Sequence, residues 1–188
     1  MPFNIQTKQD LVTLHEVGHF TVLYALGLYP QFQSITNQST GPGTLGLIDY
    51  DRSELAGIPQ EISTCIKERQ YSKLNYLTFE KTPTLCIKQI AVLLGGGAIC
   101  RYYGVEDPYD LCKVDDAGIK GIVATYGLTE ETLPALKTMA DGFMKTIFMK
   151  YDSIIRRLYS ELGQSSTIGR EEMDDILNRL RKEFPGVL

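Results

Sequence analysis

Both histidines of this 188-residue chain lie in one short stretch, His15-Glu16-Val17-Gly18-His19. Apolar residues recur around it at helical spacing, Thr7 and Asp10 can cap its start, and Gly27 and Pro30 end the pattern. A helix over 8–27 places the two imidazoles one turn apart on one face. Seven flanking residues are too apolar for an exposed helix: Leu11, Val12, Leu14, Val17, Phe20, Val22 and Leu23. The two histidines would then be polar groups in a half-buried place, and such groups need partners.

The stretch has the spacing H-E-x-x-H, which is typical of zinc peptidases. Two histidines at i and i+4 can reach one metal ion, and the glutamate beside them can take a proton from water. A chance match in a chain with two histidines is expected about one time in a thousand. The alternative is a pair of surface histidines with a solvated glutamate, and the apolar flanks disfavour it. We therefore predict His15 and His19 as zinc ligands and Glu16 as the catalytic base.

A catalytic zinc ion takes three protein ligands and keeps one position open. Because the chain has no third histidine, the third ligand must be a carboxylate or a cysteine. Carboxylates are concentrated after residue 105, at Glu106, Asp107, Asp110, Asp115 and Asp116. The pair Asp115-Asp116 opens a predicted helix, whose first turn would hold the side chains. Each acid could instead cap a helix or stay solvated, so the residues alone leave the choice open.

The rest of the chain predicts a mostly α fold with a small β-hairpin, in one domain over 1–188. The β region covers 31–50, with short strands at 33–36 and 45–50 joined by a turn at 40–44. A glycine-rich helix covers 83–102, and its three glycines at 95–97 cost up to about 1 kcal/mol each, which close helix–helix contact would explain. C-terminal helices are expected within 115–183, at 115–126, 130–161 (with a break near Gly142) and 169–183. Residues 51–80 predict a polar loop followed by a helix.

Composition narrows the function classes. The net charge of −4 and the pI near 5.2 weigh against a nucleic-acid partner. The longest nearly apolar run, 90–100, is too short to span a bilayer, and the first residues lack the features of a signal peptide. The four cysteines form no C-x-x-C pair and predict reduced thiols in a cytoplasmic protein: Cys65, Cys86, Cys100 and Cys112.

The sequence resembles the protease domain of FtsH-type ATP-dependent zinc proteases. The stretch 15–20 resembles the family's H-E-A-G-H-A helix, and 90–96 resembles its I-A-V-L-L-G-G helix. Weaker likenesses follow in the same order, at 34–36, 44–47 and 151–180. This likeness, which covers most of the chain, implies a helical zincin with a small β element. It also implies an aspartate as third ligand at a helix start, for which Asp116 fits best and Asp110 is the rival.

Two departures from the family pattern bear on function. The sequence contains no G-x-x-x-x-G-K-[ST] loop, so the resemblance is to the protease domain without its ATPase module. In addition, Cys100-Arg101-Tyr102 stands where the family has an acidic pair after the glycine-rich helix. Folded substrates would then need a separate ATPase partner, whereas peptides or unfolded proteins would not.

The predicted function is that of a zinc-dependent metalloendopeptidase, with His15, His19 and Asp116 as ligands and Glu16 as general base for a zinc-activated water. An extended peptide would lie along the strand near 44–50. The alternative is a catalytically silent, protease-like module that binds metal and acts through protein partners. A weaker alternative is a metal-dependent hydrolase of amides other than peptides.

Overall fold

The computed structural model describes residues 3–41, 45–50, 82–125 and 133–186. The predicted loop and helix at 51–80 therefore lie outside the described residues. The described elements are α1 (Lys8–Ala25), η1 (Tyr29–Gln31), β1 (Phe32–Thr36), β2 (Leu47–Tyr50), α4 (Thr82–Tyr102), α5 (Cys112–Thr125), α6 (Leu133–Lys150), α7 (Asp152–Ser165), β3 (Thr167–Gly169) and α8 (Arg170–Glu183). The prediction of a mostly α fold with a small β element is confirmed.

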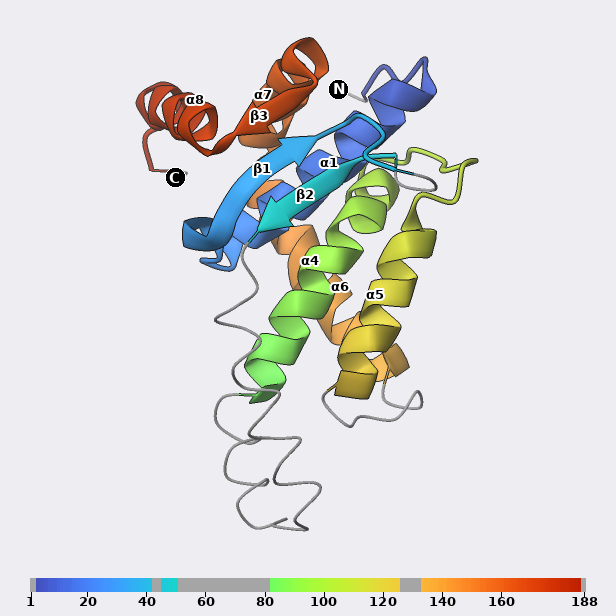
Figure 1. The fold of residues 1–188 in the computed structure, drawn as a ribbon. Helices are drawn as coiled ribbons and strands as arrows, with labels where there is room; N and C mark the ends of the chain where they lie inside the picture. Colours follow the sequence, from blue (N-terminus) through green and yellow to red (C-terminus); the bar gives the residue numbers. More distant parts are fainter. Residues whose placement is uncertain (1–2, 42–44, 51–81, 126–132, 187–188) are drawn as a thin grey trace.

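Helix α1 lies at the centre of the molecule, between the sheet and helices α4 and α7 (Figure 1). Its start is the predicted capping box, in which Thr7 and Asp10 bond each other's backbone N–H groups. After Ala25 the chain turns through Gly27, whose φ of 75° favours glycine. All residues from Leu11 to Leu23 are buried, polar ones included. A helix enclosed on every side explains why the flanks of the histidines are apolar all round.

Among the described residues, the sheet is antiparallel and has three strands in the order β2-β1-β3. Pairing of β1 with β2 confirms the predicted hairpin, with Ile35 opposite Ile48. The third strand was not predicted, because three residues carry too little alternation to indicate a strand. It pairs Ile168 with Ile35, and of these three described strands β2 lies at one edge.

The C-terminal helices differ from the predicted boundaries. The long helix expected at 130–161 bends at Tyr151, between α6 and α7, and not near Gly142. Backbone hydrogen bonds continue through the bend, from Tyr151 to Ile147 and from Ile155 to Tyr151. The bend lets α7 bury Ile154, Ile155, Leu158 and Leu162 in the core. Helix α5 begins at Cys112, three residues before the predicted start.

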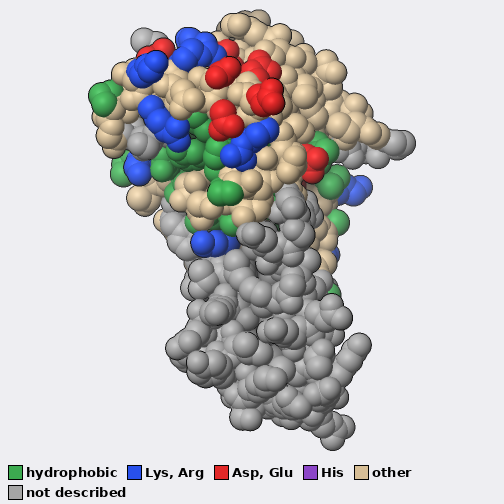
Figure 2. All heavy atoms as spheres, turned by 60° about the vertical axis from the view of Figure 1, so that its left-hand side comes forward, with side chains coloured by type: hydrophobic (Ala, Val, Ile, Leu, Met, Phe, Trp, Pro, Cys, Tyr) green, Lys and Arg blue, Asp and Glu red, His purple; other side chains and the backbone are tan. Residues whose placement is uncertain are grey.

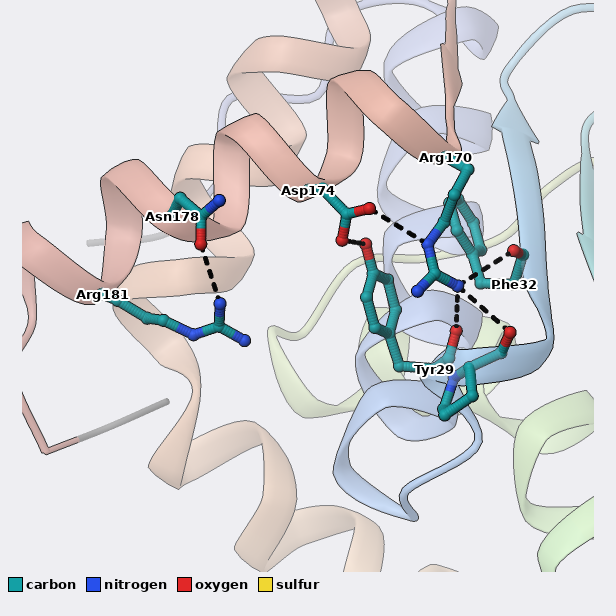
Figure 3. Close-up of polar contacts among 7 residues, drawn as sticks. Tyr29, Phe32, Arg170, Asp174, Asn178 and Arg181 are labelled. Carbon is teal, nitrogen blue, oxygen red and sulfur yellow. Dashed lines mark hydrogen bonds and ion pairs between the residues drawn. The ribbon is translucent and has the colours of Figure 1, made fainter.

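Arg170, the first residue of α8, connects the C-terminal helix to η1 and β1 (Figure 3). Its guanidinium donates to the backbone carbonyls of Tyr29, Pro30 and Phe32 and lies 4.2 Å from the centre of the Tyr29 ring. The Asp174 carboxylate accepts from both Arg170 and the Tyr29 hydroxyl. We call Tyr29, Arg170 and Asp174 the α8 latch.

Basic and acidic side chains lie close together on the face turned forward in Figure 2. Ion pairs of this kind join Arg157 and Arg179 to Glu161 on α7 and α8. Within the described residues, no helix is both long and apolar enough to cross a membrane.

Candidate metal site

His15, Glu16 and His19 lie together on α1, in the interior of the protein. They are 3%, 5% and 3% exposed, and their potential ligand atoms lie within 4.8 Å of one another. The two imidazole rings meet edge to face, with centroids 4.7 Å apart. This group could hold a metal ion.

The carboxylate that faces the two histidines is that of Asp115. Its Oδ2 atom lies 3.0 Å from His15 Nε2 and 3.4 Å from His19 Nε2. Asp116, expected in this place, points away and accepts from Lys137 Nζ at 2.8 Å. In the structure, the carboxylate that faces the two histidines is therefore that of Asp115 and not that of the expected Asp116. Asp110 lines the same pocket at its outer side, in a left-handed backbone conformation with φ of 53°.

The periodicity of α5 explains why Asp115 and not Asp116 faces inward. Asp115 shares a helix face with Ile119 and Val123, which are 0% and 2% exposed. Asp116 shares its face with the exposed Lys120. This signal was present in the sequence, since residues 115, 119 and 123 recur every four positions, and it would have separated the two aspartates.

The second nitrogen of His19 is held by the backbone of α4. Nδ1 donates to the carbonyl of Val92 at 2.6 Å, which leaves Nε2 on the side of Asp115. The Gly96 N–H lies 3.3 Å from the same Nδ1, a longer and weaker approach. A carbonyl bonded to one ring nitrogen is the usual support of a metal-binding histidine. His15 Nδ1, in contrast, is buried with no partner among the described residues.

Burial and charge shift the acid–base behaviour of these groups in opposite directions. Burial raises the pKa of Glu16 to about 7. Burial works to lower the pKa of His19, but the Asp115 and Glu16 carboxylates and the Val92 carbonyl together outweigh it and raise that pKa to about 9. Burial also opposes ionisation of Asp115, yet the neighbouring histidines hold its pKa well below the usual range. In the protein without metal, His19 and Asp115 thus form a buried ion pair at neutral pH.

Three glycines lie so close to neighbouring atoms of the site that a side chain at their positions would collide with them. A Cβ on Gly18 would lie 2.5 Å from the Gly95 carbonyl oxygen, so α1 and α4 cross in backbone contact. A Cβ on Gly96 would collide with the His15 ring, and one on Gly46 would lie 2.5 Å from Glu16 Oε1. Close helix contact, predicted for the glycines at 95–97, is thus found at Gly95, while Gly96 makes room for His15. The role of Gly46 was not predicted, because no sequence pattern near it indicates that it lies against the Glu16 side chain.

A pocket of about 560 Å³ opens onto His15, Glu16, His19 and Asp115. Its walls come from β2 with the two residues before it, from α1, from α5 with the loop before it, and from Leu93 on α4. Three of the four large apolar side chains exposed among the described residues line it: Leu47, Tyr109 and Val114, at 41%, 48% and 56%.

One further prediction concerns the cysteines. Cys100 and Cys112 are free thiols, as predicted, whereas Cys65 and Cys86 lie outside the described side chains.

No protein-family model matches the chain, and no curated protein matches it.

Proposed function

We propose that this chain is a zinc metalloendopeptidase whose ligands are His15, His19 and Asp115. The observation that carries the proposal is the position of one Asp115 oxygen within 3.4 Å of both histidine Nε2 atoms. Two imidazoles and a carboxylate form a common ligand set of catalytic zinc, with one position left open for water or substrate. The Val92 carbonyl behind His19 and the space left by Gly96 for His15 fit such a centre.

Glu16 is the group we assign to proton transfer. When bound, zinc would polarise the scissile carbonyl and make a water molecule more acidic. Glu16 takes a proton from the attacking water and delivers it to the amine that leaves. A pKa of about 7 in the metal-free site suits a group that must accept and release a proton near neutral pH. Glu16 also lines the pocket where substrate would lie.

The pocket supports an extended peptide as substrate. Of the three described strands, β2 lies at one edge and lines the pocket, so a peptide can add to it as a further strand. The exposed Leu47, Tyr109 and Val114 offer apolar surface to peptide side chains. An unfolded segment can enter this pocket directly, whereas a folded protein would need a separate ATPase to unfold it. The order of motifs and the helical fold with a small sheet support an FtsH-like protease domain.

The test combines metal content with cleavage of an unfolded, disulfide-free test protein. We expect about one zinc ion per chain, lost in His19→Ala, because a catalytic site needs each of its protein ligands. Glu16→Gln should keep zinc but lose cleavage, while Glu172→Gln, an exposed change on α8, should keep both. Zinc binding without cleavage in the wild type would favour the silent module. Undiminished cleavage by Glu16→Gln would remove the assigned mechanism.

A further inference from the structure

Two lysines from different parts of the chain stand at the outer side of the pocket. Lys8 is the first residue of α1, and Lys113 is in the first turn of α5. Both line the pocket and both are exposed. Lys8 Nζ lies 5.1 Å from the centre of the Tyr109 ring, so α1 and the loop before α5 meet on this side of the pocket.

Among the described residues, some basic side chains are engaged in ion pairs and others, these two lysines included, are not. Six basic side chains each pair with a carboxylate: Arg101, Lys137, Arg156, Arg157, Arg170 and Arg179. Within the part of the chain that the structure describes, neither Lys8 nor Lys113 has a carboxylate within ion-pair distance. An ammonium group carries three donors on a flexible stem, so both can turn toward a bound molecule.

Among the exposed charged side chains that line the pocket, two are positive and one is negative. The Asp115 carboxylate lies at the inner end of the pocket, where it contacts the two histidines. Asp110 is the other carboxylate of the lining besides Glu16, and it offsets one of the two lysines. Although the chain has a net charge of −4, these two ammonium groups stand at the pocket. They favour a ligand that carries an anionic group.

We propose, as a consequence of the peptidase function proposed above, that the pocket selects peptides with a carboxylate close to the scissile bond. The carboxylate is bound by Lys8 and Lys113, and a neighbouring apolar side chain of the peptide contacts Leu47, Tyr109 and Val114. Two chemical sources supply such a carboxylate: the side chain of an aspartate or glutamate, and the C-terminus of the peptide itself.

The experiment compares matched fluorogenic peptides that share one apolar core. One pair differs by an internal Glu or Gln, and the other pair ends in a carboxylate or an amide. The kcat/KM of each is measured with wild type, Lys8→Gln, Lys113→Gln and the double variant. Binding of the same peptides, labelled, is measured by fluorescence anisotropy with Glu16→Gln protein. Lys120→Gln is the control, because Lys120 is exposed two turns further along α5 and does not line the pocket.

We expect wild type to prefer the carboxylate member of at least one pair by about fivefold, as for exposed charge pairs. The double variant should lose this preference, Asp110→Asn should increase it, and added salt should weaken it. Whichever pair shows the preference identifies the source of the carboxylate. Equal kcat/KM and equal binding within both pairs would overturn the inference and leave the peptidase function standing. Wild type that cleaves no peptide would overturn the function, and this inference with it.

Discussion

Two regions stabilise the fold by different kinds of contact. One is the crossing of α1 and α4, and the other is the α8 latch. At the crossing, Gly18 and Gly95 let two backbones touch beneath the histidines, and nothing there is exposed to solvent. In the latch, the side chains of Arg170 and Asp174 are 37% and 49% exposed and act through hydrogen bonds and charge. Close packing tolerates almost no added volume, whereas exposed polar contacts are replaced by water at little cost. The region that holds the candidate metal site is therefore less able to accept change than the latch.

The largest effect is expected at the crossing. Gly18→Ala should lower the free energy of unfolding by about 3 kcal/mol, because the new Cβ meets the Gly95 carbonyl at 2.5 Å and neither backbone can move aside. Gly163→Ala on α7 is the matched control, with open space around its Cβ, and should stabilise by about 0.5 kcal/mol. Urea unfolding of both variants measures the difference. Similar values for the two would mean that the crossing is not tightly packed.

The second prediction separates the two aspartates at the start of α5. Asp115→Asn should weaken zinc binding by about a hundredfold or more, because it removes the carboxylate that faces both histidines. Asp116→Asn should leave binding unchanged, since it removes only an exposed contact with Lys137. Competition with a zinc-binding dye measures both affinities. A larger loss in Asp116→Asn would restore the sequence-based assignment.

The third prediction concerns pH. With a pKa of about 9 in the metal-free protein, His19 carries a proton at neutral pH that zinc must displace. Zinc affinity should therefore rise by about tenfold per pH unit between pH 7 and 9, and level off above. Calorimetric titrations in buffers of different ionisation enthalpy count the protons released. An affinity that is constant over this range would contradict the buried ion pair of His19 with Asp115.

The smallest effect is expected in the latch. Arg170→Gln should cost about 1 kcal/mol, because several partly buried hydrogen bonds are exchanged for bonds to water. The latch lowers the pKa of Asp174 through the Tyr29 hydroxyl and Arg170, so its contribution is present at neutral pH and is lost as the pH falls below about 3.8. Arg181→Gln, also drawn in Figure 3, is the control and should have almost no effect. A cost above 3 kcal/mol for Arg170→Gln would show that the latch is as critical as the crossing.

The sequence by itself determined the helix of the site and its polar residues. Its capping box, its apolar flanks and the spacing of His15, Glu16 and His19 are local properties, so they could be predicted and the structure places them as expected. The glycine-rich segment could also be assigned to a helix contact, because glycines inside a helix need a reason.

Only the tertiary structure decided what surrounds that helix. Asp115 lies 100 residues from His15 along the chain, and Gly46 lies 30 residues from Glu16. No local sequence pattern indicates which distant residue packs against a given side chain. Strand β3 was missed for the same reason, since three residues become a strand only when β1 is beside them. Helix caps and periodicity come from neighbours along the chain, whereas the completed site depends on where separate elements pack, and packing is a property of the whole fold.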